Sequence, residues 1–413
     1  MRRQIPVFPG SLPLDLPVVP PHYSRVVRKP LVASYCTTFL KPEMMHIYRQ
    51  VTALRRVDTF VITKERRCED RFPFSEIELH RPAKTNFLRR FWLKYIRKEP
   101  PVVYRGEYGA LQKILARRGA DLMHVYFGHT GVHLLPILQR WDRPTVVSFH
   151  GMDVQTREDQ PGYAERLREL LQTVPLAMVR SESLKQRLLD LGCPEAKIRI
   201  NRTGIPMDQF PWKQRKLPED GQAWHLVQAC RLIDKKGLDL TLQAFAGFSK
   251  SCPTAKLTIA GEGPLEDSLR QMARDLGVAE RVHFAGFLDV DGLRELYHDA
   301  HLFIHPSRMT ADQNQEGVPN SMVEAMATGL PVLATLHGGI PEAVESGRTG
   351  FLVPEDDGPA LLHHLGLLTQ SPETWRTFSE AAAQSARENF EQAAQIQRLE
   401  SIYLEALEIW DKA

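Results

Sequence analysis

The chain has 413 residues, 43% of them hydrophobic and 25% charged, a composition typical of a globular protein with more than one core. It contains no run of about 18 apolar residues, so a membrane-spanning helix is not expected. The net charge of +3 is unevenly divided, because residues 1–205 hold 35 Lys and Arg against 20 Asp and Glu, while the remainder holds 18 against 30. The basic first half predicts an anionic partner.

The N-terminal segment, residues 1–29, begins with two arginines, but prolines and Asp15 leave it without the apolar region of a signal peptide. We therefore predict a Pro-rich arm and a cytoplasmic protein. The five cysteines are scattered and include no C-x-x-C pair, which favours thiols in a reducing compartment over a metal site. These cysteines are Cys36, Cys68, Cys193, Cys230 and Cys252.

Residues 30–208 alternate short apolar runs with helical patterns, which predicts a Rossmann-like domain on a parallel sheet. Loops after such strands lie at the carboxyl edge of the sheet, where open α/β sheets bind ligands. One of these loops carries His150, Gly151 and Asp153, and Asp153 could either orient His150 or cap the next helix. The predicted strands are 31–36, 57–63, 121–127, 146–149, 177–181 and 198–205, with helices at 43–56 and 182–191.

The segment from Phe87 to Lys98 interleaves aromatic and aliphatic side chains with five basic residues at helical spacing. One interpretation is an amphipathic helix on an anionic membrane surface. The alternative is a core helix that packs on the sheet while its Lys and Arg side chains extend to solvent.

A segment rich in Pro, Lys and Gln, residues 209–221, predicts an interdomain linker. A second α/β domain is expected at 222–389, followed by an amphipathic helix at 390–413. In the second domain Arg231 and Lys236 flank a strand-to-helix loop, where two cations can neutralise a diphosphate.

A possible metal motif, Asp289-Val290-Asp291, stands at the beginning of a helical pattern. Aspartates at that position commonly cap a helix and complement its dipole. We therefore predict capping there and no metal site.

Two carboxylates eight positions apart, Glu316 and Glu324, flank the beginning of another helix. Residues 318–321 lie where backbone N–H groups have no intrahelical partner, and a helix N-terminus favours a phosphate. Glu316 lies just outside this end, where it could accept hydrogen bonds from a sugar. Glu324, two turns inside, could bind a ribose diol.

The run from Glu316 to Val332 resembles the E-x7-E signature of family-4 retaining glycosyltransferases of the GT-B fold, the glycosyl transferases of group 1. The similarity extends to Arg231-x4-Lys236, to 338–342 and to 350–354, in the family order. The loop Thr38-Phe39-Leu40 is similar to that of exopolysaccharide enzymes and lacks the glycine pair of many relatives.

This resemblance implies two Rossmann-like domains facing across a cleft, with the last helix crossing back to the first domain. It implies that four residues stabilise the reacting sugar and its leaving diphosphate, namely His150, Arg231, Lys236 and Glu316. It further implies that the donor is bound by Gly151, Asp153, Gly261, Gly263, Phe287, Leu288, Val318, Pro319, Asn320, Ser321 and Glu324. No metal or other cofactor is expected, because cations and a helix end bind the diphosphate.

The implied function is the transfer of a sugar from a UDP- or GDP-sugar to a glycan or lipid-linked acceptor hydroxyl, with retention and by front-face attack. The basic first half favours an anionic acceptor at the inner face of the cell membrane and not a nucleic acid. A soluble sugar or sugar phosphate is the alternative acceptor. The remote alternatives are a nucleotide-sugar epimerase or phosphorylase and a non-catalytic sugar-binding subunit.

Overall fold

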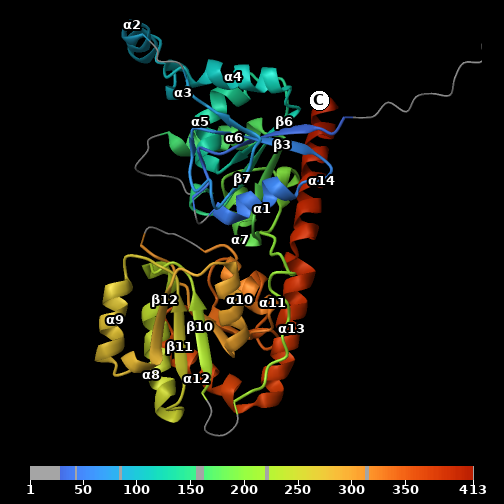
Figure 1. The fold of residues 1–413 in the computed structure, drawn as a ribbon. Coiled ribbons are helices and arrows are strands. Elements are labelled where there is room, and N and C mark those ends of the chain that lie inside the picture. The colour runs from blue at the N-terminus through green and yellow to red at the C-terminus, as the bar shows by residue number, and fades with distance from the viewer. Residues whose placement is uncertain are drawn as a thin grey trace, which may run out of the picture.

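Two α/β domains lie one above the other in the computed structural model, and two successive C-terminal helices run along their side, one beside each domain (Figure 1). The structure describes residues 28–41, 44–82, 86–154, 162–218, 223–311 and 316–412. All but the last two residues of the predicted Pro-rich arm lie outside this part of the chain. The two-domain architecture with a crossing helix confirms the expected fold class.

The first domain is built on a seven-stranded sheet with the order β5-β3-β1-β6-β7-β8-β9. Every pairing in it is parallel. Its strands are β1 (Leu31–Tyr35), β3 (Asp58–Thr63), β5 (Ile77–Leu79), β6 (Leu122–Tyr126), β7 (Thr145–Phe149), β8 (Leu176–Val179) and β9 (Ile198–Ile200), beside a small pair, β2 (Thr38–Phe39) and β4 (Glu65–Arg66). Its helices are α1 (Met45–Ala53), α2 (Phe87–Phe91), α3 (Pro101–Tyr104), α4 (Glu107–Arg118), α5 (Gly128–Leu138), α6 (Tyr163–Thr173) and α7 (Glu182–Asp190).

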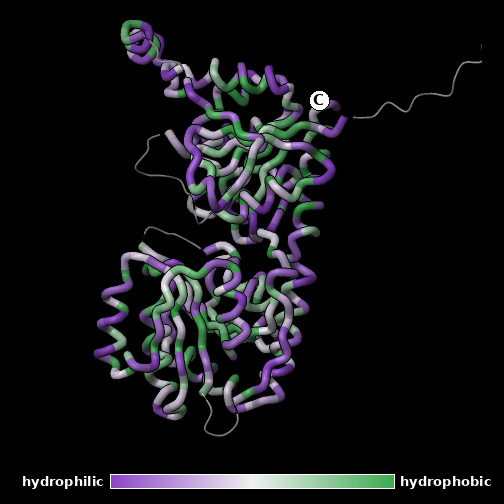
Figure 2. Tube along the Cα trace, viewed as in Figure 1, coloured by the Kyte–Doolittle hydropathy of each residue, from purple (hydrophilic) through white to green (hydrophobic). Residues whose placement is uncertain are grey.

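The second domain holds a six-stranded parallel sheet with the order β12-β11-β10-β13-β14-β15. Its strands are β10 (His225–Ala229), β11 (Lys256–Ala260), β12 (Val282–Gly286), β13 (Leu302–His305), β14 (Val332–Thr335) and β15 (Gly350–Val353). Its helices are α8 (Leu238–Ser251), α9 (Glu266–Asp275), α10 (Val290–Asp299), α11 (Asn320–Ala327), α12 (Gly358–Gln370) and α13 (Pro372–Phe390), with α14 (Gln392–Asp411) leading back to the first domain. Apolar residues concentrate along the strands of both sheets (Figure 2).

The crossing helix α14 covers one face of the first sheet. Its side chains Leu399, Ile402, Tyr403 and Ala406 pack in one buried cluster with apolar residues of β1, β6, β7 and β8. Burying a side chain such as Leu399 or Ile402 stabilises the fold by about 1.5–3 kcal/mol. The helix begins at Gln392, two residues later than the periodicity predicts, because Phe390 still belongs to α13 and to the core of the second domain.

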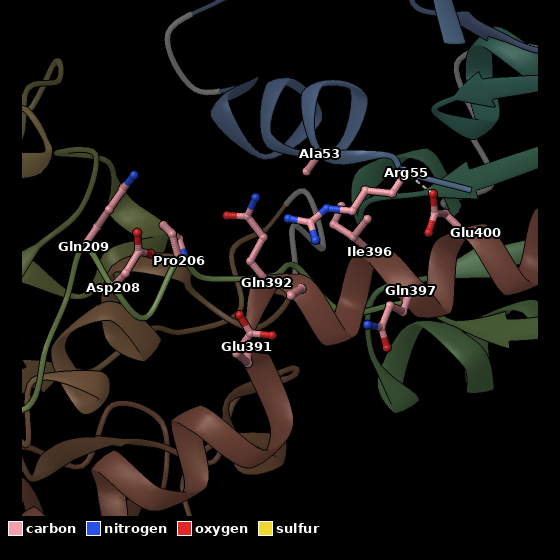
Figure 3. A pocket seen from close by; sticks show the side chains of 11 residues that line it. Ala53, Arg55, Pro206, Asp208, Gln209, Glu391, Gln392, Ile396, Gln397 and Glu400 are labelled. Atoms are coloured by element: carbon pink, nitrogen blue, oxygen red, sulfur yellow. Dashed lines mark hydrogen bonds between the residues drawn. The ribbon is translucent and has the colours of Figure 1, made fainter. Parts of the chain in front are cut away.

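A cavity of about 270 Å³ lies between the end of α1, residues 206–209 and the beginning of α14 (Figure 3). Beside it the buried Glu400 of α14 accepts hydrogen bonds from the backbone N–H groups of Arg55 and Arg56, both at 2.5 Å. This anchors the end of α1 to the crossing helix. The first domain's α1 is therefore fixed relative to the chain that leads to the second domain.

A carboxylate of the second domain also holds the first domain. Glu342 lies in the short helix Ile340–Glu342, and its Oε1 accepts hydrogen bonds from the N–H groups of Glu182 (2.7 Å) and Ser183 (3.3 Å) at the N-terminus of α7. Its Oε2 pairs with Arg202 at 3.1 Å. A carboxylate at a helix N-terminus is stabilised by the helix dipole, so this contact joins the two domains.

The segment 87–98 does not form the single helix that its spacing predicts. Helix α2 continues into a wider π-helical turn, Trp92–Ile96, and the pair projects away from the domain (Figure 1). No residue of either piece is buried, which excludes the core-helix alternative. Along the described part of the chain no helix is long and apolar enough to span a membrane.

Candidate active site

A cleft of about 780 Å³ separates the two domains and is lined by residues of both. The first domain contributes α1 and the ends of β7 and β8 through His46, His150, Gly151 and Arg180. The second contributes the loops after its strands and the beginning of α11. The predicted site residues in this lining are His150, Gly151, Arg231, Lys236, Gly261, Phe287, Leu288, Glu316, Val318, Pro319, Asn320, Ser321 and Glu324.

A carboxylate between two lysines forms the most strongly charged part of the cleft. Lys236 Nζ lies 2.6 Å from Glu316 Oε1, and Lys235 Nζ lies 3.2 Å from Oε2. Burial opposes ionisation of Glu316, but the two lysines outweigh it and hold its pKa well below the ordinary value. Lys235 was not predicted as a site residue, although it immediately precedes Lys236. With Arg231 nearby, the group carries a net positive charge.

The backbone of Glu316 is also held from behind. Its N–H group donates to His337 Nε2 at 2.9 Å, and His337 Nδ1 lies 2.7 Å from Glu355 Oε1. Because Nε2 accepts, Nδ1 must carry the proton and donate to the carboxylate. His337 is fully buried, so this arrangement fixes the loop that presents Glu316.

Helix α11 begins at Asn320, and its preceding residue, Pro319, makes no side-chain cap. Residues 318–321 line the cleft, so the uncapped and positively polarised end of the helix faces it. Ser321 Oγ donates to the carbonyl of Ala229 at 2.6 Å, which ties α11 to the end of β10. The helix end and the lysine pair therefore face the same cavity.

Two glycines let the loops after β10 and β11 approach each other. A Cβ on Gly261 would lie 1.9 Å from the Cys230 carbonyl oxygen, and one on Gly263 would lie 2.4 Å from that of Leu232. Gly261 also has a φ of +127°, which side chains disfavour. Gly261 lines the cleft and Gly263 does not, so a donor contact for Gly263 stays a prediction.

The predicted ribose-binding carboxylate, Glu324, faces a residue that no sequence pattern indicated. Arg49 of α1 lies 3.4 Å from Glu324 Oε1, and both side chains are about nine-tenths buried. Burial raises the pKa of Glu324 despite this partner. The pair joins the first domain to α11 across the cleft.

His150 lies at the tip of β7, as predicted, but both of its ring nitrogens are engaged. Nδ1 lies 3.2 Å from His46 Nε2, and Nε2 lies 2.9 Å from Ser148 Oγ. Asp153 does not contact the ring of His150 or cap the next helix, but its carboxylate accepts from the backbone N–H groups of His150, Gly151 and Gly128, all at 2.8 Å. It is buried behind the turn and fixes the loop, so its contact with a donor stays a prediction.

Arg180 follows β8, whose neighbour β7 ends at Phe149, directly before His150. Its guanidinium donates to Thr203 Oγ1 and has no ion-pair partner within 4 Å in the described residues. Burial lowers the pKa of Arg180 to about 10, which leaves it charged at neutral pH, and Asp153 and Glu316 support the charge. Its place at a strand's carboxyl end was the signal that could have identified it.

Phe287 and Leu288 occupy the rim of the cleft on the second domain. The Phe287 ring is half exposed, and the guanidinium of Arg71, from the first domain, lies 4.5 Å from its centroid. The neighbouring Asp289 Oδ1 accepts from the Gly292 N–H at 2.9 Å, which makes it the N-cap of α10, as predicted. Within the described residues no group of three potential metal ligands occurs.

Comparisons with known proteins agree with this geometry. Residues 44–209 match a family model described as Glycosyltransferase Family 4, and residues 210–385 match Glycosyl transferases group 1. A relative from Salmonella typhimurium, named as the colanic acid biosynthesis glycosyltransferase WcaL, is 31% identical over 68% of this chain and 70% of its own. The amylovoran biosynthesis glycosyltransferase AmsK of Erwinia amylovora is 32% identical over 64% and 68%.

Solved structures show the same fold. Anabaena HepE in complex with UDP has a TM-score of 0.73 at 17% identity, covering 91% of this chain and 100% of its own. Sucrose-phosphate synthase from Thermosynechococcus elongatus has a TM-score of 0.70 at 19% identity, covering 91% and 98%. The chain therefore belongs to the group 1 glycosyltransferases and has the GT-B fold. It is a hexosyl-transferring enzyme that uses a nucleotide-sugar donor.

Proposed function

We propose that this protein transfers a hexose from a UDP- or GDP-sugar to a hydroxyl group of a glycan or lipid-linked acceptor, with retention of configuration and without a metal. One observation carries the proposal. The Lys235–Glu316–Lys236 group, Arg231 and the uncapped end of α11 surround one cavity. Such a set of fixed positive charges suits a diphosphate that accumulates charge as it leaves.

The residues of the first-domain wall support attack from the face of the departing group. Among the described lining residues, that wall carries imidazoles and a guanidinium but no carboxylate to act as a nucleophile. In this step the bond from the sugar's anomeric carbon to the diphosphate oxygen breaks, and the acceptor oxygen bonds to the same carbon from the same side. The acceptor's proton passes to the departing phosphate oxygen. Lys236 and Arg231 stabilise the charge on that oxygen.

Two classes of donor are supported, the UDP-sugars and the GDP-sugars. The HepE structures contain UDP and UDP-glucose, whereas a mannosyltransferase of Mycolicibacterium smegmatis, 29% identical to this chain, is named as GDP-mannose-dependent. A thermal-shift panel of nucleoside diphosphates and their sugars separates them, because a bound ligand raises Tm by mass action. We expect UDP or GDP, in the presence of EDTA, to raise Tm. No shift with either would contradict the proposal.

A lipid-linked acceptor is supported by the projecting segment 87–98. Its exposed apolar side chains are interleaved with cations, the composition that binds the interface of an anionic bilayer. The exposed side chains are Phe87, Leu88, Phe91, Trp92, Tyr95 and Ile96. The enzyme would then act at the inner face of the cell membrane. A soluble sugar phosphate acceptor would not require this exposed surface of apolar and basic side chains.

Vesicle sedimentation tests the membrane contact. We expect the wild type to bind vesicles containing phosphatidylglycerol and not those of phosphatidylcholine alone. The double variant Trp92→Ser/Ile96→Ser should lose this binding. A matched control, Leu336→Ser/Leu367→Ser, removes two exposed leucines of the second domain and should retain it. Equal binding by both variants would contradict the assignment.

A further inference from the structure

One face of the central sheet in the first domain changes from apolar to polar toward the cleft. Successive residues on the same face of a strand are two positions apart. On β6 this face carries Leu122 and then His124, and on β7 it carries Val146 and then Ser148, with His150 following at the strand's tip. The apolar members pack against α14. The polar members therefore form a buried row that leads from α14 to the cleft.

This row is a continuous chain of hydrogen bonds. His46 Nε2 lies 3.2 Å from His150 Nδ1, and His150 Nε2 lies 2.9 Å from Ser148 Oγ. Ser148 Oγ lies 2.9 Å from His124 Nε2, and His124 Nδ1 lies 2.7 Å from the hydroxyl of Tyr403. Tyr403 belongs to α14, the helix that runs along this domain after leaving the second (Figure 1). The chain thus joins the crossing helix to the cleft.

The chain has a direction because its members are neutral. Burial lowers the pKa of His124 to about 3 and also lowers the pKa of His150, so each imidazole has a single N–H group. Ser148 has one proton to donate, and no other acceptor for it is found in the described residues. If Ser148 donates to His150, then His124 must donate to Ser148 and Tyr403 to His124; otherwise every bond is reversed. In either case the tautomer of His150 is coupled to the hydroxyl of Tyr403.

We propose that Ser148, His124 and Tyr403 are positioning residues that fix the ring orientation and the tautomer of His150 at the cleft. The crossing helix would thereby complete the catalytic site in addition to covering the sheet. A fully satisfied buried polar chain rigidifies its members, whereas apolar side chains at the same positions would pack without fixing an imidazole. This inference rests on the proposed glycosyl transfer at the cleft.

Removing the hydroxyl of Tyr403 tests the inference. We expect Tyr403→Phe, which keeps the ring in its buried cluster, to lower kcat about tenfold because His150 loses its orientation. The affinity for UDP or GDP should stay within twofold, since no residue near the diphosphate changes. A matched control is Tyr297→Phe, which removes a hydroxyl with no hydrogen-bond partner in the described residues from a fully buried tyrosine of the second domain. It should leave kcat unchanged.

A second variant shows whether Ser148 and Tyr403 act through one hydrogen-bonded chain or have independent structural effects. Ser148→Ala interrupts the chain beside His150 and should lower kcat as much as Tyr403→Phe does. The double variant should be no slower than Ser148→Ala alone, because the chain is already broken. Losses that multiply, or a Tyr403→Phe variant with wild-type kcat, would overturn the inference. If Tyr403→Phe does not fold, Ser148→Ala with wild-type kcat overturns it.

Nuclear magnetic resonance gives a readout that does not depend on the stability of the protein. In protein with 15N-labelled histidine, the wild type should show one tautomer for His150, and Tyr403→Phe should show a mixture or the other tautomer. An unchanged His150 signal would overturn the inference. Failure of the proposed function itself is distinguishable, because it would appear as absent binding of UDP and GDP by the wild type.

Discussion

The two walls of the cleft are built in different ways. The second-domain wall is made of charges on the loops that follow β10 and β13, which are neighbours in the sheet, with Glu316 held between Lys235 and Lys236. The first-domain wall is made of His150 and Arg180 at the tips of the adjacent strands β7 and β8, with His46 of α1 beside them. This difference indicates a division of labour, in which one wall neutralises a leaving diphosphate and the other orients the sugar and the acceptor.

The largest effect should come from the second wall. Lys236→Ala or Glu316→Ala should lower kcat by about 10²-fold or more, because a preorganised charge at the leaving group contributes about 3 kcal/mol. Steady-state kinetics measure this, with circular dichroism to confirm folding. Lys250→Ala, which removes an exposed cation of α8, is the control. Near-normal turnover in both site variants would remove the assigned roles.

A buried histidine lies behind each wall, His124 in the first domain and His305 in the second. A buried imidazole that stays neutral makes the free energy of unfolding depend on pH. Burial lowers the pKa of His305, beneath the Lys236–Glu316 pair, to about 3. Folded His305 therefore stays neutral where the unfolded chain takes up a proton, and stability falls as pH falls below about 6.5, by up to about 1.4 kcal/mol per pH unit.

Replacing His305 measures its contribution to this pH dependence. His305→Leu should make the free energy of unfolding fall less steeply between pH 6.5 and 5, measured by urea denaturation at each pH. In the described residues neither ring nitrogen of His305 has a hydrogen-bond partner, so the apolar side chain leaves none unpaired. The exposed His283 provides the control variant His283→Leu. An unchanged slope in His305→Leu would show that burial does not keep this imidazole neutral.

Replacing Arg180 tests whether the first-domain wall binds an anionic group of a substrate. Arg180→Gln should raise KM about tenfold for whichever substrate brings an anionic group to it, because a partly buried cation without a carboxylate partner in the described residues can pair with that group. Kinetics with donor and acceptor varied separately, and with Arg180→Lys as a conservative variant, measure the effect. Arg168→Gln on the exposed face of α6 should change neither KM. If Arg180→Gln changes neither, the residue serves packing alone.

The smallest effect should come from the contact that joins the walls. Glu342→Gln weakens the pairing with Arg202 and with the N-terminus of α7, each a partly exposed interaction of about 0.3–1 kcal/mol. We expect kcat/KM to fall about two- to threefold, and small-angle scattering to show a slightly larger radius of gyration. Glu345→Gln, three residues away and paired within its own domain, is the control. A more compact Glu342→Gln variant would contradict this role.

The sequence by itself indicated most residues of the second wall and the fold class. Arg231, Lys236, Glu316 and the beginning of α11 stand in short local patterns, and local patterns report where strands end and helices begin. The alternation of strands and helices likewise indicated two parallel sheets, both of which the structure contains. The sequence did not determine whether segment 87–98 is exposed, because the same spacing suits a core helix and a surface helix.

Only the tertiary structure decided which residues share the first wall. His46, His150 and Arg180 are far apart in the chain and meet because β7 and β8 are neighbours and α1 is anchored by α14. Arg49 reaches Glu324, and Tyr403 reaches His124 across 279 positions, for the same reason. Strand order and helix docking are set by long-range packing of apolar faces, and a periodic pattern does not state which face meets which.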